Sequence, residues 1–105
     1  MKQTPTKRSL ALMRETCDAV QVVEHWNAFA RIRQDLFGFV DILCLRGEET
    51  IAVQSTSWAN VSARVKKIAE SPLVGAVRKA GWKIIVHGWR KNNAGRYEVK
   101  TIDVS

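Results

Sequence analysis

The feature that most constrains the fold is a pair of apolar segments separated by a four-residue turn. Residues 38–45 (GFVDILCL) and 50–56 (TIAVQST) flank residues 46–49 (RGEE). Both segments carry apolar residues at successive positions, which is typical of central strands that are covered on both faces. Pairing them across the turn sets Asp41 directly opposite Gln54. Opposed residues share one face of a sheet with Cβ atoms about 5 Å apart, so we expect a carboxylate and an amide to meet on an otherwise apolar face.

The burial of Asp41 needs a chemical explanation. A buried carboxylate without a partner is costly and tends to become protonated. A divalent cation is one solution, and a neighbouring Arg or Lys is the other. Asp41 is therefore either a metal ligand or a structural acid, and Gln54 is either a ligand or a polar residue that satisfies its neighbours. Thr56, two residues beyond Gln54, points to the same face.

Helices and further strands are predicted on both sides of this hairpin. Thr4 and Pro5 begin a helix as its N-cap and first turn, and its apolar stripe ends near Asp18. The other predicted elements are a strand at 19–26, an exposed connection that can include a helical turn at 27–37, a helix at 58–70 capped by Ser57, a short helix from 71 closed by Gly81, a strand at 82–89, a hairpin loop at 91–95 and a strand at 96–104. This order predicts a single α/β domain, residues 1–105, with a mixed central sheet flanked by helices.

Charge and composition indicate the class of partner. The chain has 17 Lys+Arg against 10 Asp+Glu, a formal net charge of +7. Such a charge attracts polyanions, although solubility alone would tolerate it. Two cysteines give neither a disulfide framework nor a zinc motif. We find no secretory signal and no apolar stretch long enough to cross a membrane, so we expect a cytoplasmic protein.

The hairpin resembles the PD-(D/E)XK nucleases, in particular their Holliday-junction-resolvase-like and small phage branches. Residues 38–41 (GFVD) are similar to the Gly-x-x-Asp that leads one metal-binding motif, and residues 53–56 (VQST) are similar to the apolar-Glu-x-Lys of the next. The resemblance covers about residues 5–90. It implies a restriction-endonuclease-like α-β-β-β-α-β core with an extra C-terminal strand. The segment RQDLFGFVD is similar to small phage members, which implies a bacterial or phage-infected cell.

The resemblance implies metal-dependent hydrolysis of phosphodiester bonds in DNA, with Mg²⁺ or Mn²⁺ as the cofactor. Asp41, Gln54 and Glu24 are the implied metal ligands, with Gln54 in place of the family's acid. A Gln carbonyl can still bind Mg²⁺, which prefers oxygen ligands. Asp35 is a further carboxylate of the site, an ion-pair partner of Arg31 or Arg33, or a loop cap.

Thr56 stands where the family has a lysine. Arg64 and Lys67, on the polar side of the following helix, are candidates to replace that lysine. The residues with an implied catalytic role are Asp41, Gln54, Thr56, Arg64 and Lys67. Because both motif positions depart from the family, a nucleic-acid-binding protein that keeps the nuclease fold without cleaving is the alternative.

Basic and aromatic side chains outside the motif are candidates for a nucleic-acid-binding rim. They are Arg31, Arg33, Lys66, Trp58 and Arg90. Each is equally compatible with an ordinary solvated surface, and Trp58 with packing. The expected partner is DNA, and a homodimer is possible because related enzymes often cut paired strands as dimers. A third hypothesis is that the positive charge belongs to an interaction module that binds an acidic protein.

Overall fold

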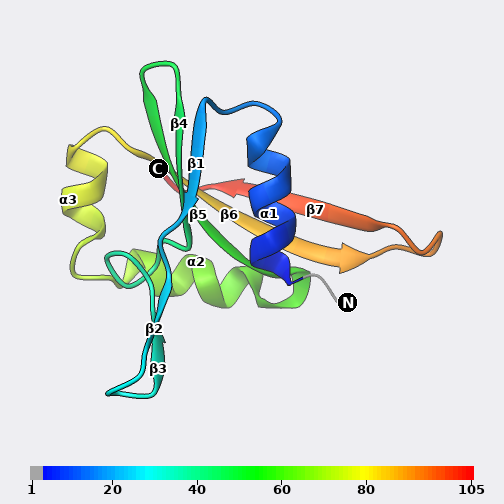
Figure 1. The fold of residues 1–105 in the computed structure, drawn as a ribbon, viewed down its shortest axis with the longest axis horizontal. Helices are drawn as coiled ribbons and strands as arrows, with labels where there is room; N and C mark the ends of the chain where they lie inside the picture. Colours follow the sequence, from blue (N-terminus) through cyan, green and yellow to red (C-terminus); the bar gives the residue numbers. More distant parts are fainter. Residues whose placement is uncertain (1–3) are drawn as a thin grey trace.

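The apolar segments lie side by side in one mixed sheet of five strands, in the spatial order β1-β4-β5-β6-β7 (Figure 1). The computed structural model describes residues 4–105. Its elements are α1 (Pro5–Arg14), β1 (Ala19–Val22), β2 (His25–Asn27), β3 (Ile32–Gln34), β4 (Ile42–Arg46), β5 (Glu49–Ser57), the 3₁₀ turn η1 (Trp58–Asn60), α2 (Val61–Ala69), α3 (Val74–Lys79), β6 (Lys83–Lys91) and β7 (Tyr97–Asp103). Strands β5 and β6 are parallel, and the other neighbours in this sheet are antiparallel. The predicted α/β class, with a mixed sheet and flanking helices, is confirmed.

The β4–β5 hairpin has the register predicted from the sequence. Leu45 pairs with Thr50, and the next residues outward, Arg46 and Glu49, also pair. The turn therefore has two residues rather than the predicted four. Its first residue, Gly47, has a φ of 59°, a left-handed conformation that glycine adopts without steric cost.

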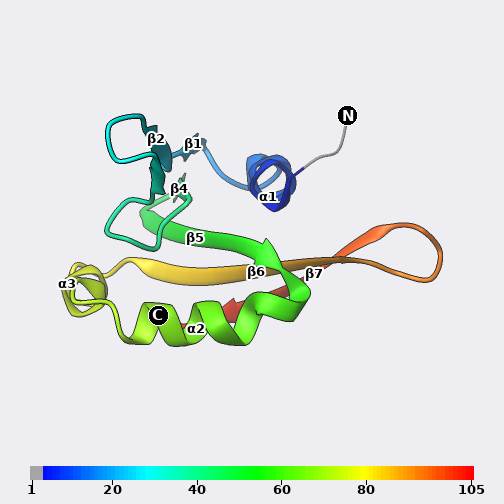
Figure 2. The same cartoon turned by 90° about the horizontal axis from the view of Figure 1, so that it is seen from below.

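The helices cover both faces of the sheet, with α1 on one side and α2 on the other (Figure 2). One core cluster joins α1 to the sheet and consists of Met13, Ile42, Cys44, Ile51 and Val53. The cluster on the opposite face includes Val61, Ile68, Val74, Val77, Ala52, Ile84 and Val86. Successive residues of β5 thus enter different cores, as the two-residue period of a strand requires. No helix within residues 4–105 is long and apolar enough to cross a membrane.

The chain before β4 differs from the prediction. Residues 19–26, expected to be one strand, divide into β1 of the main sheet and β2, which pairs with β3 in a separate two-stranded sheet. Residues 27–37, expected to be a connection with a helical turn, supply the rest of this hairpin. Burial periodicity could not indicate it, because Trp26 and Ile32 on its strands are exposed.

Residues 38–41 were predicted in β4 but lie in a compact loop that precedes it. Val40 N–H donates to the carbonyl of Leu36 at 2.9 Å, and Leu36 N–H donates back at 3.0 Å. Phe37 and Gly38 have φ values of 56° and 83°, and this left-handed conformation is uncommon for a bulky residue such as Phe37. Phe39 and Val40 are buried and anchor the loop. The loop returns the chain on itself between positions 35 and 41.

The helix ends agree only in part with the predicted signals. Thr4 caps α1 as predicted, since its Oγ1 accepts from Lys7 N–H at 3.2 Å, but α1 ends at Arg14 rather than near residue 18. Ser57 makes no side-chain cap hydrogen bond, and η1 precedes the regular helix α2. Gly81, with a φ of 82°, follows α3 as expected of a residue that ends a helix.

Candidate metal and nucleic-acid site

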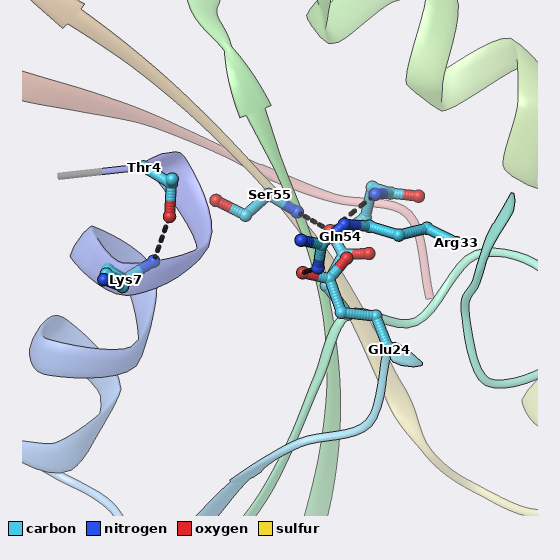
Figure 3. A network of polar contacts seen from close by, with 7 residues as sticks. Thr4, Lys7, Glu24, Arg33, Gln54 and Ser55 are labelled. Atoms are coloured by element: carbon cyan, nitrogen blue, oxygen red, sulfur yellow. Dashed lines mark hydrogen bonds and ion pairs between the residues drawn. The ribbon is translucent and has the colours of Figure 1, made fainter. Parts of the chain in front are cut away.

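Asp41 lies immediately before β4 and is 3% exposed. Gln54 Nε2 donates a hydrogen bond to Asp41 Oδ2 at 2.7 Å, and Ser55 N–H donates to the same oxygen at 2.8 Å (Figure 3). Asp41 N–H donates to the carbonyl of Val53 at 2.9 Å, which continues the register of the hairpin. The sequence prediction that Asp41 and Gln54 are neighbours is therefore confirmed. Both donors use Oδ2, and Oδ1 takes part in neither of these two bonds.

Two further carboxylates approach Asp41. Oxygen atoms of Glu24, Asp35 and Asp41 all lie within 4.8 Å of one another. Glu24 lies in the break between β1 and β2, and Asp35 directly follows β3, so the base of the β2–β3 hairpin carries both. Carboxylates this close repel one another unless a proton or a cation lies between them.

The pKa of Asp41 reflects this environment. Burial is the main cause that raises it from 3.8 to about 8, and the charges of Asp35 and Glu24 act in the same direction. The hydrogen bond from Ser55 N–H acts in the opposite direction because it stabilises the carboxylate. Without a cation, Asp41 is therefore mostly protonated at neutral pH. A cation that binds there must displace this proton.

Basic side chains share the cleft with the carboxylates. Arg33 Nη1 lies 3.3 Å from Glu24 Oε1, and Lys67 Nζ lies 3.8 Å from Asp35 Oδ2. Arg64 also lines the cleft, which has a volume of about 260 Å³. Among the ion pairs of residues 4–105, none involves Arg64 or Asp41. Asp35 therefore pairs with Lys67 rather than with Arg31 or Arg33, the partners considered from the sequence.

The carbonyl of Gln54 is buried, and its Oε1 accepts no hydrogen bond from the described part of the chain. An unsatisfied buried acceptor costs about 1–3 kcal/mol. In this structure the amide presents its nitrogen to Asp41, not its oxygen. Carboxylate and carbonyl oxygens are the ligands that Mg²⁺ and Mn²⁺ prefer. The three carboxylates of Glu24, Asp35 and Asp41 therefore fit a hard divalent cation. The Gln54 carbonyl would join them only if its amide turned over, which would break the hydrogen bond to Asp41.

The remaining residues of the predicted site lie outside this cleft. Thr56 is buried, 5% exposed, and does not line it. Lys66 is exposed on α2 next to Lys67, and Arg31 lies in the turn between β2 and β3. None of the three shares the cleft with Asp41.

Trp58 and Arg90 contact each other instead of the carboxylates. The guanidinium of Arg90 lies 3.7 Å from the centre of the Trp58 ring, and Arg90 also pairs with Glu98. A cation over the ring face stabilises this arrangement. A base could stack on Trp58 only where Arg90 does not cover the ring.

A buried polar network behind β5 was not predicted from the sequence. Ser9 Oγ lies 2.8 Å from Ser55 Oγ and 2.8 Å from His87 Nδ1, and Trp89 Nε1 donates to it at 2.9 Å. Burial lowers the pKa of His87 from 6.5 to about 4, so this imidazole is neutral near pH 7. The network ties α1 and β6 to the residue whose N–H holds Asp41. Its sequence signal is the presence of Ser55 and His87 inside otherwise apolar strands.

Comparison with known proteins gives no match: no protein-family model, no curated protein sequence and no solved structure is significantly similar to the chain. Any assignment of function therefore depends on the geometry of the cleft.

Proposed function

We propose that this protein is a metal-dependent nuclease that hydrolyses phosphodiester bonds of DNA. The observation that carries the proposal is the meeting, in one cleft, of three carboxylates within 4.8 Å of one another and three basic side chains. Metal-assisted phosphodiester hydrolysis needs acidic groups that hold a cation and basic groups that neutralise the phosphate. This cleft contains both.

The order of elements supports a restriction-endonuclease-like scaffold of the PD-(D/E)XK type. Helix α1, the antiparallel strands β1, β4 and β5, helix α2 and the parallel strand β6 follow the implied α-β-β-β-α-β order, with the short helix α3 added between α2 and β6. Asp41 immediately before the second of these strands and Gln54 on the third stand where the resemblance implies the metal-binding motif. The β2–β3 hairpin is then an insertion, and β7 is the extra C-terminal strand.

Glu24, Asp35 and Asp41 would hold Mg²⁺ or Mn²⁺. Gln54 would add its carbonyl oxygen only by turning its amide over and giving up the hydrogen bond to Asp41. A cation bound there polarises the phosphate and lowers the pKa of a bound water. Asp41, which is mostly protonated at neutral pH because its pKa is about 8, would release this proton to solvent when the cation binds. Ser55 N–H keeps Asp41 Oδ2 in position during the exchange.

Lys67 and Arg64 would supply the positive charge that the substrate needs. Both extend from α2 into the cleft. A phosphate oxygen competes with Asp35 for Lys67 Nζ, and Arg64 stabilises the negative charge that develops on the phosphate. Thr56 does not take the role of the family's lysine in this proposal, because its side chain is buried outside the cleft.

A nucleic-acid-binding protein that does not cleave is the second candidate. The amide at Gln54 and the buried hydroxyl at Thr56, in place of an acid and a lysine, favour it. The net charge of +7 supports binding of a polyanion in either case. The two candidates differ in metal-dependent cleavage.

Cleavage of branched and linear DNA with Mg²⁺ or Mn²⁺ tests the proposal. Asp41→Asn is the informative variant, because its side-chain oxygen can still accept from Gln54 and Ser55. Asp18→Asn is the matched control: Asp18 is exposed, lies outside the cleft and accepts from Gly47 N–H at 2.7 Å, a bond that Asn can also accept.

We expect the wild type and Asp18→Asn to cleave and Asp41→Asn to be inactive. Equal cleavage by the wild type and Asp41→Asn would contradict the proposal. Binding to DNA that weakens steeply with salt, without cleavage of any substrate by the wild type, would favour the second candidate.

A further inference from the structure

The β2–β3 hairpin projects away from the main sheet and is hydrogen-bonded as a two-stranded ribbon of its own (Figure 1). Phe29 at its tip is 101% exposed, and Trp26 and Ile32 on its strands are 59% and 50% exposed. Trp26 and Ile32 lie on opposite faces of the ribbon, because Trp26 pairs with Arg33 and Ile32 with Asn27. The fully exposed Phe29 at the tip is the apolar side chain that a partner would have to cover.

The tip of the hairpin is held in a defined conformation. Asn27 Oδ1 accepts hydrogen bonds from the backbone N–H groups of Phe29 at 3.1 Å and Ala30 at 3.0 Å. Arg31 then adopts a left-handed conformation with a φ of 55°, which brings the chain back into β3. The turn therefore presents Phe29 by its own backbone geometry, as Asx turns do.

The charge of the hairpin indicates what would cover this surface. Residues 25–34 include Arg31 and Arg33 but no Asp or Glu, while Glu24 and Asp35 flank the hairpin at its base. Arg33 lies 3.3 Å from Glu24 Oε1, so a phosphate would compete with Glu24 for it, whereas Arg31 follows the tip directly. Trp26 lies opposite Arg33 in the ribbon, so an aromatic ring and a guanidinium are cross-strand neighbours. Arginines bind phosphates and aromatic rings stack on bases. A second copy of this chain, with the same basic hairpin and a net charge of +7, would be repelled.

The hairpin is connected directly to the cleft. Glu24 precedes it, Asp35 follows it, and Arg33 on β3 lines the cleft. Nucleic acid bound along the ribbon would therefore lead to the carboxylates.

We propose that this hairpin is a wedge that inserts Phe29 between bases of DNA while Arg31 and Arg33 bind the neighbouring phosphates; the inference rests on the proposed nuclease function. Apolar side chains that insert between base steps unstack them and kink the duplex. The cost of unstacking is smaller where pairing is already interrupted. The substrate class is therefore DNA with an unpaired bulge rather than a continuous duplex.

The test compares a bulged duplex with its fully paired counterpart, with 2-aminopurine at the bulge and EDTA to prevent cleavage. We expect the wild type to bind the bulged duplex more tightly and to raise the 2-aminopurine fluorescence. Phe29→Ala should lose the preference, with affinity for bulged DNA lower by on the order of 10-fold, the loss of one base–aromatic stacking contact. Phe29→Trp should retain it. Leu73→Ala, which alters an exposed apolar residue before α3, is the control and should match the wild type.

The Asp41→Asn variant tests the insertion of Phe29 into DNA independently of the proposed nuclease activity. It should keep the preference and the fluorescence change while it loses cleavage. If the wild type unstacks the bulge but never cleaves DNA, the proposed nuclease activity is wrong and the proposed insertion of Phe29 between bases still stands. Retention of the preference in Phe29→Ala overturns the wedge, as does failure of the wild type to bind DNA. Sedimentation that finds a wild-type dimer and a Phe29→Ala monomer would also overturn it, because the tip would then cover a second copy.

Discussion

Gln54 and Asp41 are joined by a hydrogen bond of 2.7 Å in which the amide nitrogen is the donor and Asp41 Oδ2 the acceptor. Ser55 N–H donates to the same oxygen. The side chain of Asp41 is thus held through one carboxyl oxygen, and its pKa is raised mainly by burial and further by the charges of Asp35 and Glu24. An asparagine can make the same two hydrogen bonds without a charge, so the structural and the electrostatic roles of this position can be separated.

Asp41→Asn is expected to remove an alkaline loss of stability. The pKa of Asp41 is raised from 3.8 to about 8 in the folded state, so Asp41 stabilises the fold below pH 3.8, and this contribution is lost as the pH rises through 8. Between pH 3.8 and about 8, the contribution of Asp41 to the free energy of unfolding falls by up to about 1.4 kcal/mol per pH unit. Thermal unfolding in EDTA between about pH 6.5 and 9 should show a falling Tm for the wild type and a constant one for the variant. A wild-type Tm that does not change with pH would contradict the assignment.

The contribution of His87 to the free energy of unfolding changes with pH in the opposite direction to that of Asp41. Burial lowers its pKa from 6.5 to about 4, so neutral His87 stabilises the fold above pH 6.5, and this contribution is lost as the pH falls through 4. In the wild type it opposes the contribution of Asp41 between these two values. Asp41→Asn should therefore lose stability on acidification from pH 6.5 to 4 more steeply than the wild type. Urea titrations at both pH values measure this, and the double variant with His87→Gln should abolish the slope.

Gly88→Ala is expected to destabilise the fold where β6 meets α2. A Cβ at Gly88 would lie 2.2 Å from Val61 Cγ2 and 3.1 Å from Trp58 Cα, whereas one at Gly75 would meet nothing within 4 Å. Overpacking of this kind costs typically about 1–3 kcal/mol. Gly75→Ala lies within α3 and should stabilise the protein by up to about 1 kcal/mol, because alanine favours helices. Chemical denaturation of the two variants measures the difference, and equal stability would contradict the close contact at Gly88.

Lys67→Ala is expected to reduce cleavage much more than Lys66→Ala. Lys67 lines the cleft and pairs with Asp35, whereas the neighbouring Lys66 is exposed and lies outside it. Loss of one group that stabilises transition-state charge lowers the rate by about 100-fold or more. Single-turnover rates at saturating DNA distinguish this effect from weaker binding. Equal rates for the two variants would exclude a specific role of Lys67.

The register of β4 and β5 could be predicted because the turn between them is short. Because both faces of these strands are apolar, the apolar pattern alone does not set the register, and the short connection between them does. This register places Asp41 beside Gln54 without any knowledge of the rest of the fold. The resemblance to a nuclease motif depends on the same two positions.

The positions of Glu24 and Asp35 depend on parts of the chain that the apolar pattern does not describe. Trp26 and Ile32 are exposed on their strands, so the β2–β3 hairpin has no buried face to indicate it. Asp35 reaches Asp41 because the chain reverses at Phe37 in a left-handed conformation, which is unusual for a phenylalanine. Glu24 and Asp35 could therefore be named as candidate ligands from the sequence, but their proximity to Asp41 could not be predicted from it.

Calorimetric titration of the protein with Mn²⁺ tests most directly whether the three carboxylates form a cation site. Near pH 7, in buffers of different ionisation enthalpy, the account predicts one bound cation and the release of close to one proton, because Asp41 is protonated before the cation binds. Asp41→Asn should lose this binding, and Asp18→Asn should keep it. Absence of binding by the wild type at millimolar Mn²⁺, or unchanged binding by Asp41→Asn, would contradict the account.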